Sequence, residues 1–399
     1  MNYMDHRDLL RQSHLAALIE SVCQSLEISP SQNQLARQRY EGVGDWLARA
    51  DDPLLVTIAI RLQGSVAIGT TVKPIGTNEH DVDLVAHLRD VEVAVSPASL
   101  KKSIGDRLRS SGSYAGLLEE MPRCWRLNYA NEFHLDITPS IPNPACRMGG
   151  ELVPDKSLRI WRASNPQGYR AKFDRRAALA PRIRRSIGKA FDSARADADI
   201  EPYPENPGLK GILRRVVQIA KRHRDVHFID EDVALAPLSI IITTLASRAY
   251  EYCVTNFEYD DELELVCDIF RRMPDMMQVD VVNGRQVWHL WNQTTEGENF
   301  CEKWNNDPRR AVAFHSWHAK ALLDLETLAA AEGLDQMRRL LGSIFGTAPA
   351  TKAIDALTER MNRARSGNLL SVGRAAGLIV GTAARSTPVR ANTFFGADC

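Results

Sequence analysis

Three aspartates stand in two short segments whose pattern is typical of β-strands. Asp81 and Asp83 flank Val82, and Asp136 stands between Leu135 and Ile137. Because residues i and i+2 of a strand point to the same face, Asp81 and Asp83 are expected to project together. Carboxylates gathered at one sheet edge repel one another unless cations neutralise them, and Mg²⁺ prefers oxygen ligands. We therefore predict a metal site formed by the three aspartates, with Mg²⁺ as its ion and Mn²⁺ as the alternative.

Such a site suits a two-metal reaction that joins nucleoside triphosphates. One ion would lower the pKa of an attacking hydroxyl, and the other would hold the triphosphate and the leaving pyrophosphate. Asp136 is expected at the ion nearest the attacking hydroxyl, because Asp81 and Asp83 can bridge both ions. The three aspartates are therefore the predicted catalytic residues.

Gly64 and Ser65 follow an apolar segment and precede the aspartates. A glycine lets the backbone approach phosphate oxygens closely, and the following N–H groups and the Ser65 hydroxyl can donate hydrogen bonds to them. Taken singly, a Gly-Ser pair is typical of a turn and a strand aspartate is typical of a solvated face. Their order and spacing together favour a phosphate-binding turn beside a metal site.

The surrounding pattern predicts an α+β fold, with a small mixed sheet and flanking helices over residues 50 to 160. Residues 7 to 50 indicate helices, with Ser29 capping the second one. Apolar, β-branched residues from Leu55 to Ile60 predict a strand, as does the alternation at 125–129 and 132–137. Helical periodicity then predicts helices at 208–224, 235–253, 260–275, 307–332, 334–345 and 350–365. The pattern divides the chain into N-terminal helices (1–50), a mixed-sheet core (51–205), a helical lobe (206–370) and a flexible C-terminal tail (371–399).

The composition of the 399-residue chain narrows the class of protein. Lys plus Arg and Asp plus Glu each number 50, so the chain lacks the basic surplus of a dedicated nucleic-acid binder. The seven cysteines form no CxxC pair, which argues against a structural zinc site. No signal peptide and no apolar run long enough to cross a membrane is found. We expect a cytoplasmic protein without a membrane partner.

The segment from Gln63 to Thr70, with Lys73-Pro74 and the segment from Glu79 to Val85, resembles the active-site region of a known family. That family is the bacterial CD-NTases, nucleotidyltransferases related to cyclic GMP-AMP synthase and 2′-5′-oligoadenylate synthase. The segment from Phe133 to Pro139 is similar to the family strand that carries the third aspartate. The resemblance implies a polymerase β-like nucleotidyltransferase catalytic core (51–205) built on a mixed sheet. It also implies that the N-terminal helices (1–50) pack on this core and that the helical lobe (206–370) closes the nucleotide cleft.

The resemblance extends into the helical lobe. Residues 213–223 are similar to the family helix whose lysine reaches the triphosphate, and Lys221 matches it better than Lys210 does. Without the resemblance, Lys221 is equally typical of a solvated helix face. Residues 237–241 are similar to the segment whose serine assists the same phosphates, which implies a nucleotide-binding role for Ser239.

The resemblance also implies what the enzyme makes. It implies synthesis of a cyclic di- or trinucleotide second messenger from nucleoside triphosphates, with ATP among them, in anti-phage defence of the CBASS type. A downstream effector would respond to the product. The segment from Pro388 to Gly396 resembles tails that are joined to targets by E1/E2-like partners, although a plain chain end is an equal interpretation. No zinc module of the animal DNA sensor is found, so DNA activation is not expected.

Other functions remain open at this stage. An RNA- or tRNA-tailing enzyme or a linear-oligonucleotide synthase would use the same aspartates, and so would a shorter antibiotic-modifying transferase. A nucleotide-sensing pseudoenzyme is disfavoured because all three aspartates are present. The aromatic and acidic segment from Glu296 to Trp304 can supply a base-stacking ring, but packing between helices is the simpler interpretation.

Overall fold

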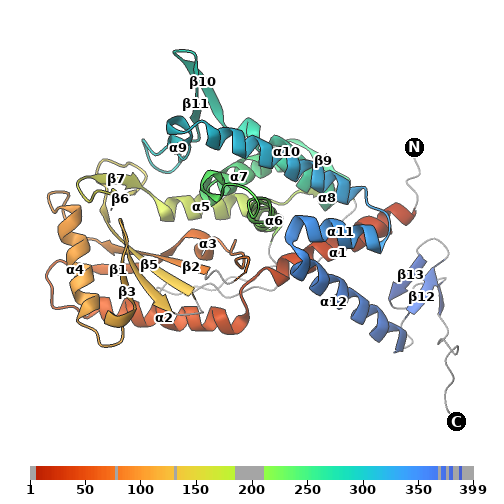
Figure 1. Cartoon of the computed structure of the whole chain (residues 1–399), viewed down its shortest axis with the longest axis horizontal. Helices are drawn as coiled ribbons and strands as arrows, with labels where there is room; N and C mark the ends of the chain where they lie inside the picture. Colours follow the sequence, from red (N-terminus) through yellow and green to blue (C-terminus); the bar gives the residue numbers. More distant parts are fainter. Residues whose placement is uncertain are drawn as a thin grey trace, which may run out of the picture.

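Two hydrophobic clusters divide the chain into a sheet lobe and a helical lobe (Figure 1). The computed structural model describes residues 6–76, 80–129, 133–184 and 211–366, with three short stretches at 370–373, 377–380 and 386–388. Among these residues, no helix combines the length and the apolar character that crossing a membrane requires. Lys210 and residues 389–399 lie outside the described residues.

The sheet lobe is built on a seven-stranded mixed sheet whose central order is β1-β2-β5-β4-β3, and β6 and β7 extend it from β5. Its strands are β1 (Ile58–Gln63), β2 (His80–Leu88), β3 (Leu118–Glu120), β4 (Trp125–Tyr129), β5 (Phe133–Pro142), β6 (Glu151–Pro154) and β7 (Trp161–Ser164). β2 and β5 are parallel, whereas β1 and β2 are antiparallel. A parallel pair of strands at the centre of the sheet thus carries the aspartates.

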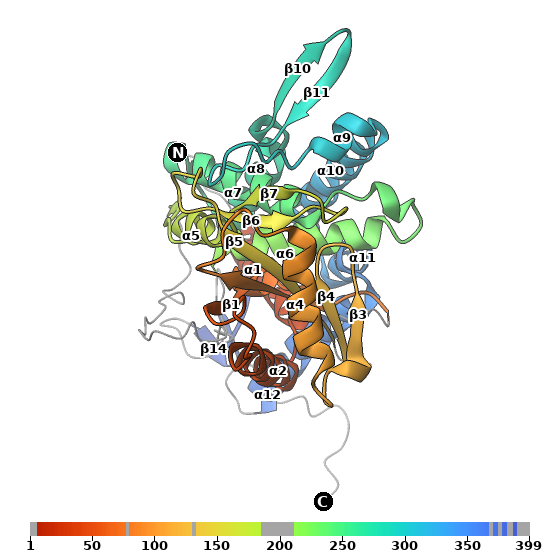
Figure 2. The same ribbon diagram turned by 90° about the vertical axis from the view of Figure 1, so that its left-hand side faces the viewer.

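One face of this sheet is apolar and covered by helices. Val82, Leu84, Leu135 and Ile137 are all fully buried, as the period of two predicts. They share a cluster with side chains of α2 (Pro30–Ala48) and α4 (Pro97–Arg109), which lie against the sheet (Figure 2). The aspartates alternate with these residues, so they project from the opposite face.

The ends of α2 and β1 show how local sequence sets the element boundaries. Ser29 caps α2 with a capping box to Gln32, which confirms the predicted N-cap. The strand predicted from Leu55 to Ile60 begins later, at Ile58. Asp52 accepts a hydrogen bond from the Leu54 amide through its side chain, and the residues from there to Ile58 form turns. The turn chemistry of Asp52 thus outweighs the β propensity of Leu55 to Thr57.

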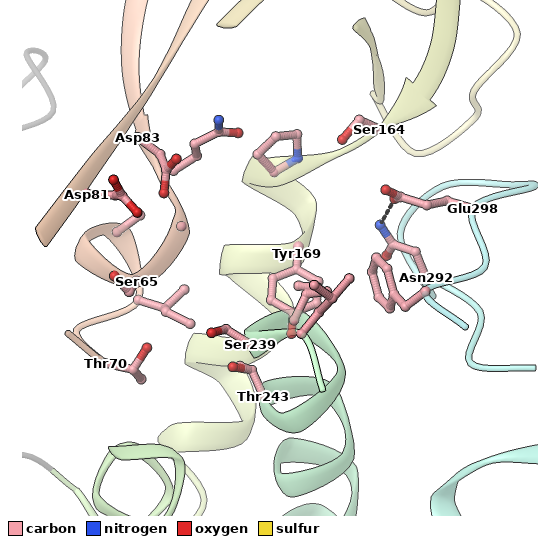
Figure 3. Close-up of a pocket in the computed structure, with 18 of the residues that line it drawn as sticks. Ser65, Thr70, Asp81, Asp83, Ser164, Tyr169, Ser239, Thr243, Asn292 and Glu298 are labelled. Carbon is pink, nitrogen blue, oxygen red and sulfur yellow. Dashed lines mark hydrogen bonds between the residues drawn. The ribbon is translucent and has the colours of Figure 1, made fainter. Parts of the chain in front are cut away.

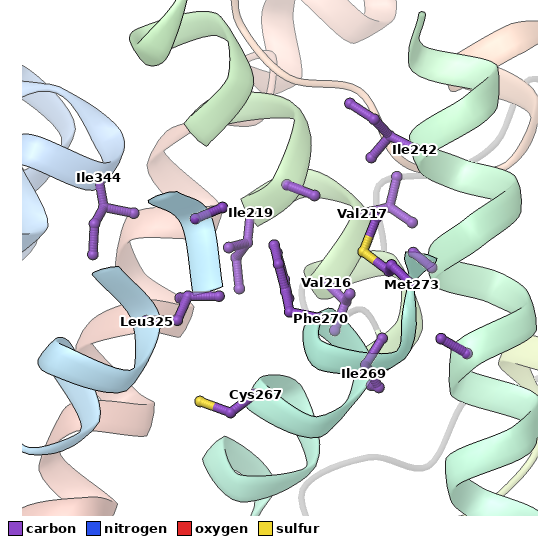
Figure 4. Packing of buried hydrophobic residues seen from close by; sticks show 14 of the residues in the cluster. Val216, Val217, Ile219, Ile242, Cys267, Ile269, Phe270, Met273, Leu325 and Ile344 are labelled. Carbon is purple, nitrogen blue, oxygen red and sulfur yellow. The ribbon is translucent and has the colours of Figure 1, made fainter. Parts of the chain in front are cut away.

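The helical lobe packs around its own core (Figure 4). Val216, Ile219, Ile242, Phe270 and Leu325 meet there from different helices and are almost completely buried. Its helices are α6 (Ile212–His227), α7 (Ser239–Asn256), α8 (Glu262–Arg272), α9 (Glu302–Asn306), α10 (Arg309–Ala329), α11 (Leu334–Phe345) and α12 (Thr347–Ser366). The periodic segments predicted from 208 to 365 correspond to these helices.

The first helix corrects one part of the predicted domain organisation. α1 (His6–Ser25) contributes Leu15, Leu18 and Val22 to the core of the helical lobe, and it contacts α6 and α12. Only α2 packs on the sheet, although both N-terminal helices were predicted to do so. The reason is that an apolar helix face packs on whichever complementary face the tertiary structure presents.

Several elements lie where the sequence predicts no regular structure. α5 (Pro166–Ala177) lies near the end of the predicted core (51–205), where no helix is predicted, and β8 (Arg182–Ile183) pairs with β9 (Glu258–Tyr259). The hairpin of β10 (Gln278–Val282) and β11 (Arg285–His289) projects from the helical lobe (Figures 1 and 2). Near the C-terminus, β12 (Leu370–Gly373), β13 (Gly377–Val380) and β14 (Ser386–Pro388) form a small antiparallel sheet. That sheet falls within the predicted tail, whose flexibility stays a prediction.

Candidate active site

The strands that carry the aspartates lie side by side at the centre of the sheet. The register of β2 and β5 pairs Asp83 with Asp136, and the register of β1 and β2 pairs Gln63 with Asp83. The turn that follows β1 therefore places Gly64 and Ser65 next to the carboxylates. The topology brings together residues that are far apart in the sequence.

Gly64 is required by the backbone at this turn. Its φ is +66°, and a Cβ atom there would lie well inside contact distance of a carboxylate oxygen of Asp83. An L-residue avoids this left-handed conformation, and its side chain would also displace the aspartate. Gly64 begins the short helix α3 (Gly64–Ala67), so Ser65 lies in its first turn. The glycine thus allows the turn and the carboxylate to approach each other.

The carboxylates destabilise one another's ionised forms. The pKa of Asp83 is raised from 3.8 to about 7, first by burial and then by the charges of Asp81 and Asp136. The pKa of Asp81 is also raised, mainly by burial, while the charge of Arg126 opposes the shift. Such a rise indicates negative charge that the surrounding protein only partly compensates. A bound cation would supply the missing compensation.

Arg126, a residue that the sequence analysis did not select, pairs with the third aspartate. From β4 its Nε donates to Oδ1 of Asp136 and its Nη2 donates to Oδ2, each at 2.7 Å. The same guanidinium lies 3.6 Å from the carboxylate of Asp81. The register pairs Arg126 with Asp136 across β4 and β5, which only the assembled sheet reveals.

Two of the three predicted metal ligands are available to a cation in this structure. Asp81 and Asp83 offer hard oxygen ligands on the wall of a cleft, as a divalent cation requires. Asp136 is instead engaged by Arg126. In the part of the chain that the structure describes, no group of three or more His, Cys, Asp or Glu side chains is arranged to hold a metal. The pair Asp81 and Asp83 is therefore the candidate cation-binding element of this conformation, and Asp136 would join it after exchanging its partner.

The cleft between the two lobes has a volume of about 1360 Å³. The sheet lobe contributes Gly64, Ser65, Asp81 and Asp83 to its walls, and the helical lobe contributes residues that include Lys221, Ser239, Asn292 and Glu298. Figure 3 shows Ser239 and Thr243 below the cleft and Glu298 across it from Asp83. This space is large enough for nucleotide ligands and brings the predicted residues of both lobes to one place.

One face of α6 holds the segment that follows Ser65. Arg214 donates to the carbonyl of Ile68 at 3.0 Å, Gln218 to that of Thr71 at 2.9 Å, and Lys221 to that of Thr70 at 2.9 Å. Residues 214, 218 and 221 are spaced as one helical face requires. That spacing is visible in the sequence, but its role is not, because the carbonyls belong to a segment about 150 residues away in the chain. Lys221 is thus a buried residue at the cleft wall rather than a solvated one.

Thr70 is a further polar residue of the cleft that the sequence analysis did not select. Its side chain is 1% exposed, and its hydroxyl has no hydrogen-bond partner among the described residues. A buried hydroxyl without a partner is energetically costly unless a ligand or water satisfies it. Because Thr70 lines the cleft, its hydroxyl is a candidate ligand contact beside Ser65.

Ser239 lies at the first position of α7, and its hydroxyl accepts a hydrogen bond from Arg224 at 3.0 Å. Arg224 also lines the cleft, where it donates to the carbonyl of Pro237. The N-terminus of a helix and a nearby guanidinium both favour anions. The structure therefore places Ser239 in a setting that can receive a phosphate.

The aromatic residues near the cleft have separate roles. Trp304 and Trp317 are buried in the core of the helical lobe, which confirms the packing interpretation for them. Phe300 instead lines the cleft together with Tyr169, and their rings meet edge to face with centroids 6.1 Å apart. The segment from Glu296 to Trp304 thus contributes both to the core and to the cleft.

Comparison with known proteins identifies the family. Residues 14–176 match the Second Messenger Oligonucleotide or Dinucleotide Synthetase domain. The chain is 30% identical to a c-di-GMP synthase of Roseivirga ehrenbergii over 96% of this chain and 98% of that protein. The chain belongs to the bacterial CD-NTases. It is accordingly a nucleotidyltransferase that makes cyclic oligonucleotides from nucleoside triphosphates, which confirms the resemblance found in the sequence.

Further CD-NTases show the same fold. The cyclic dinucleotide synthase CdnG of Bradyrhizobium diazoefficiens is 26% identical over 96% of this chain and 94% of that protein. A structure of CdnG in complex with GTP superposes with a TM-score of 0.65 at 20% identity, covering 86% of this chain and 99% of CdnG. A GTP-bound form of DncV from Vibrio cholerae superposes with a TM-score of 0.52 at 15% identity, covering 87% of each chain. These likenesses confirm the predicted α+β, polymerase β-like nucleotidyltransferase fold.

Proposed function

We propose that this CD-NTase makes a guanine-containing cyclic dinucleotide from GTP in a divalent-cation-dependent reaction, with Mg²⁺ as the ion. The observation that carries the proposal is the shared cleft, in which Asp81 and Asp83 lie beside Gly64 and Ser65 on the sheet lobe. The two curated relatives, a c-di-GMP synthase and a cyclic dinucleotide synthase, align over nearly the whole chain and support a dinucleotide product. The expectation that ATP is also a substrate stays a prediction.

One set of cleft residues would bind the phosphates, and another set would bind the cation. The backbone after Gly64 and the hydroxyls of Ser65 and Thr70 would bind phosphate oxygens. Lys221 would add a positive charge from the helical lobe by exchanging the carbonyl of Thr70 for a phosphate, a stronger acceptor. Ser239, at the N-terminus of α7, would bind the same triphosphate from the helical lobe.

Asp81 and Asp83 would hold the cation, and Asp136 would complete its ligands. When bound, a divalent cation lowers the pKa of a hydroxyl nucleophile and stabilises the charge of a leaving pyrophosphate. Asp136 is the carboxylate best placed to orient the attacking hydroxyl, because the register sets it beside Asp83. To take this role, Asp136 must give up one or both of the hydrogen bonds that it accepts from the Arg126 guanidinium.

The test of this proposal is product formation by the purified protein. The protein is incubated with Mg²⁺ and the four labelled triphosphates, and the products are treated with phosphatase and identified by chromatography and mass. We expect a phosphatase-resistant cyclic dinucleotide that contains guanine and is absent from the Asp81→Ala/Asp83→Ala variant. Long or phosphatase-sensitive products would instead support a tailing enzyme or a linear-oligonucleotide synthase. Mg²⁺-dependent nucleotide binding without any product would support a nucleotide sensor.

The biological setting belongs to the same proposal. A cyclic dinucleotide made by a CD-NTase is suited to anti-phage signalling of the CBASS type through a downstream effector. Conjugation of the C-terminus by an E1/E2-like partner stays a prediction, since residues 389–399 lie outside the described residues. Exposing cells that carry the gene and its inactive Asp81→Ala/Asp83→Ala form to phage would test the defence role, and equal infection of both would refute it.

A further inference from the structure

The wall of the cleft opposite the aspartates carries a positioned carboxylate. Asn292 and Glu298 lie in the loop between β11 and α9, and both line the cleft. Figure 3 shows them across the cleft from Asp81 and Asp83, with Tyr169 between the two sides. A triphosphate held at the aspartates would direct the rest of its nucleotide toward this wall. The mechanism of phosphate transfer does not use either residue.

Hydrogen bonds fix the orientation of this carboxylate. The amide N–H and the hydroxyl of Thr294 both donate to Oδ1 of Asn292, at 2.9 and 2.8 Å. The side-chain oxygen of Asn292 is therefore identified, and its Nδ2 is left to donate to Oε2 of Glu298 at 2.7 Å. The backbone N–H of Asn292 also donates to the carbonyl of Glu298 at 2.9 Å, which closes the loop. Glu298 is thus a preorganised acceptor rather than a freely rotating side chain.

The charges around Glu298 also suit recognition of a base. Burial raises the pKa of Glu298, while the hydrogen bond from Asn292 and the charge of Arg123 lower it. Arg123, whose charge acts on Glu298, lines the same cleft, and so do Lys156 and Lys303. The wall therefore combines one oriented acceptor with several cationic donors.

The Watson–Crick edges of the bases differ in how they meet a carboxylate. Guanine presents two adjacent donors, N1–H and the 2-amino group, which match the two oxygens of a carboxylate. Adenine and cytosine each place an acceptor nitrogen beside their amino group, and uracil places a carbonyl on either side of its single N–H. Guanine also carries O6 and N7, the acceptors that arginine and lysine most often contact. An oriented carboxylate beside cationic groups therefore selects guanine.

We infer that Glu298, positioned by Asn292, recognises the guanine base of a GTP bound in the cleft. This inference rests on the proposed function and extends it by naming the residue that selects the base. Glu298 accepts hydrogen bonds from N1–H and the 2-amino group, and a cationic neighbour such as Arg123 donates to O6. Asn292 acts as a positioning residue.

The experiment compares GTP with inosine triphosphate, which differs from GTP only by the loss of the 2-amino group. For the wild type, we expect kcat/KM for GTP to exceed that for inosine triphosphate about tenfold, the value of one hydrogen bond to a charged acceptor. In Glu298→Gln, Nδ2 of Asn292 would donate to the side-chain oxygen of the introduced glutamine. The N–H groups of that glutamine would then face the base. The preference for GTP over inosine triphosphate should then fall to within about twofold, and use of ATP should rise.

Glu332→Gln is the matched control, because Glu332 is exposed in the helical lobe and does not line the cleft. It should keep the wild-type preference. If Glu298→Gln does not fold, as judged by circular dichroism, the wild-type comparison decides, and a preference for GTP below about twofold overturns the inference. An unchanged preference in folded Glu298→Gln overturns it as well.

The outcomes separate this inference from the proposed function. A wild-type enzyme that converts GTP through Asp81 and Asp83, but whose base preference does not depend on Glu298, refutes the inference alone. A wild-type enzyme that forms no product from GTP refutes the proposed function. Equilibrium competition of GTP and inosine triphosphate against a fluorescent guanine nucleotide then tests Glu298 directly. Equal loss of affinity for both competitors in Glu298→Gln would overturn the inference.

Discussion

Asp83 should make the metal-free protein less stable as the pH rises. Its pKa is raised from 3.8 to about 7 by burial and by the neighbouring aspartates. Between these two values the folded protein holds a proton that the unfolded chain has released, so stability falls with increasing pH. At about 1.36 kcal/mol per pH unit, the total loss is at most about 4 kcal/mol. Asp83→Asn cannot ionise and should escape this loss.

The assay is urea unfolding of the wild type and Asp83→Asn in EDTA. The stability advantage of the variant should grow by about 2 kcal/mol from about pH 5.5 to about pH 8.5, because the titration between pH 3.8 and 7 is only partly complete at the lower pH. Asp335→Asn, a change at an exposed position in the first turn of α11, is the control and should show no such growth. An advantage that stays the same at both pH values would refute the reasoning about Asp83.

Restoring the cation should reduce the stability advantage of Asp83→Asn. Mg²⁺ that binds only the folded protein stabilises it by RT ln(1 + [Mg²⁺]/Kd), so the protein that binds it more tightly gains more. Because Asp83→Asn lacks one carboxylate ligand, added Mg²⁺ should stabilise the wild type more than the variant at about pH 8.5. Equal stabilisation of both proteins would show that Asp83 is not a ligand.

The remaining predictions concern three other residues of the site. Gly64→Ala should lower product formation at least about tenfold and cost about 1–3 kcal/mol of stability. The reason is that Ala disfavours the left-handed backbone and displaces Asp83. Initial rates measure product formation, and urea titrations measure the stability. Arg126→Gln should cost about 1–3 kcal/mol in EDTA, yet lower the Mg²⁺ concentration for half-maximal activity, because a competing cation is removed. Lys221→Met should raise KM for GTP about tenfold, whereas Lys102→Met at the surface should not. Unchanged values in these assays would contradict the assigned roles.

Local sequence patterns are enough to identify the chemical groups of the site. The period of two around Asp81, Asp83 and Asp136 places carboxylates opposite a buried apolar face, and that alternation depends only on strand geometry. Helix periodicity likewise identified the helical lobe, and Ser29 identified the start of α2. Such local signals are readable because they depend on residues that are close in the chain.

Which groups face one another across the site depends on the packing of segments that are far apart in the chain. The register of β4 and β5 pairs Arg126 with Asp136. The two N-terminal helices pack on different lobes, because the apolar face of α1 fits the core of the helical lobe. The carbonyls that α6 holds, and the placement of Glu298 opposite the aspartates, likewise depend on the packing of the two lobes. Contacts between distant segments depend on how complementary surfaces fit, and no local pattern in one sequence encodes that fit.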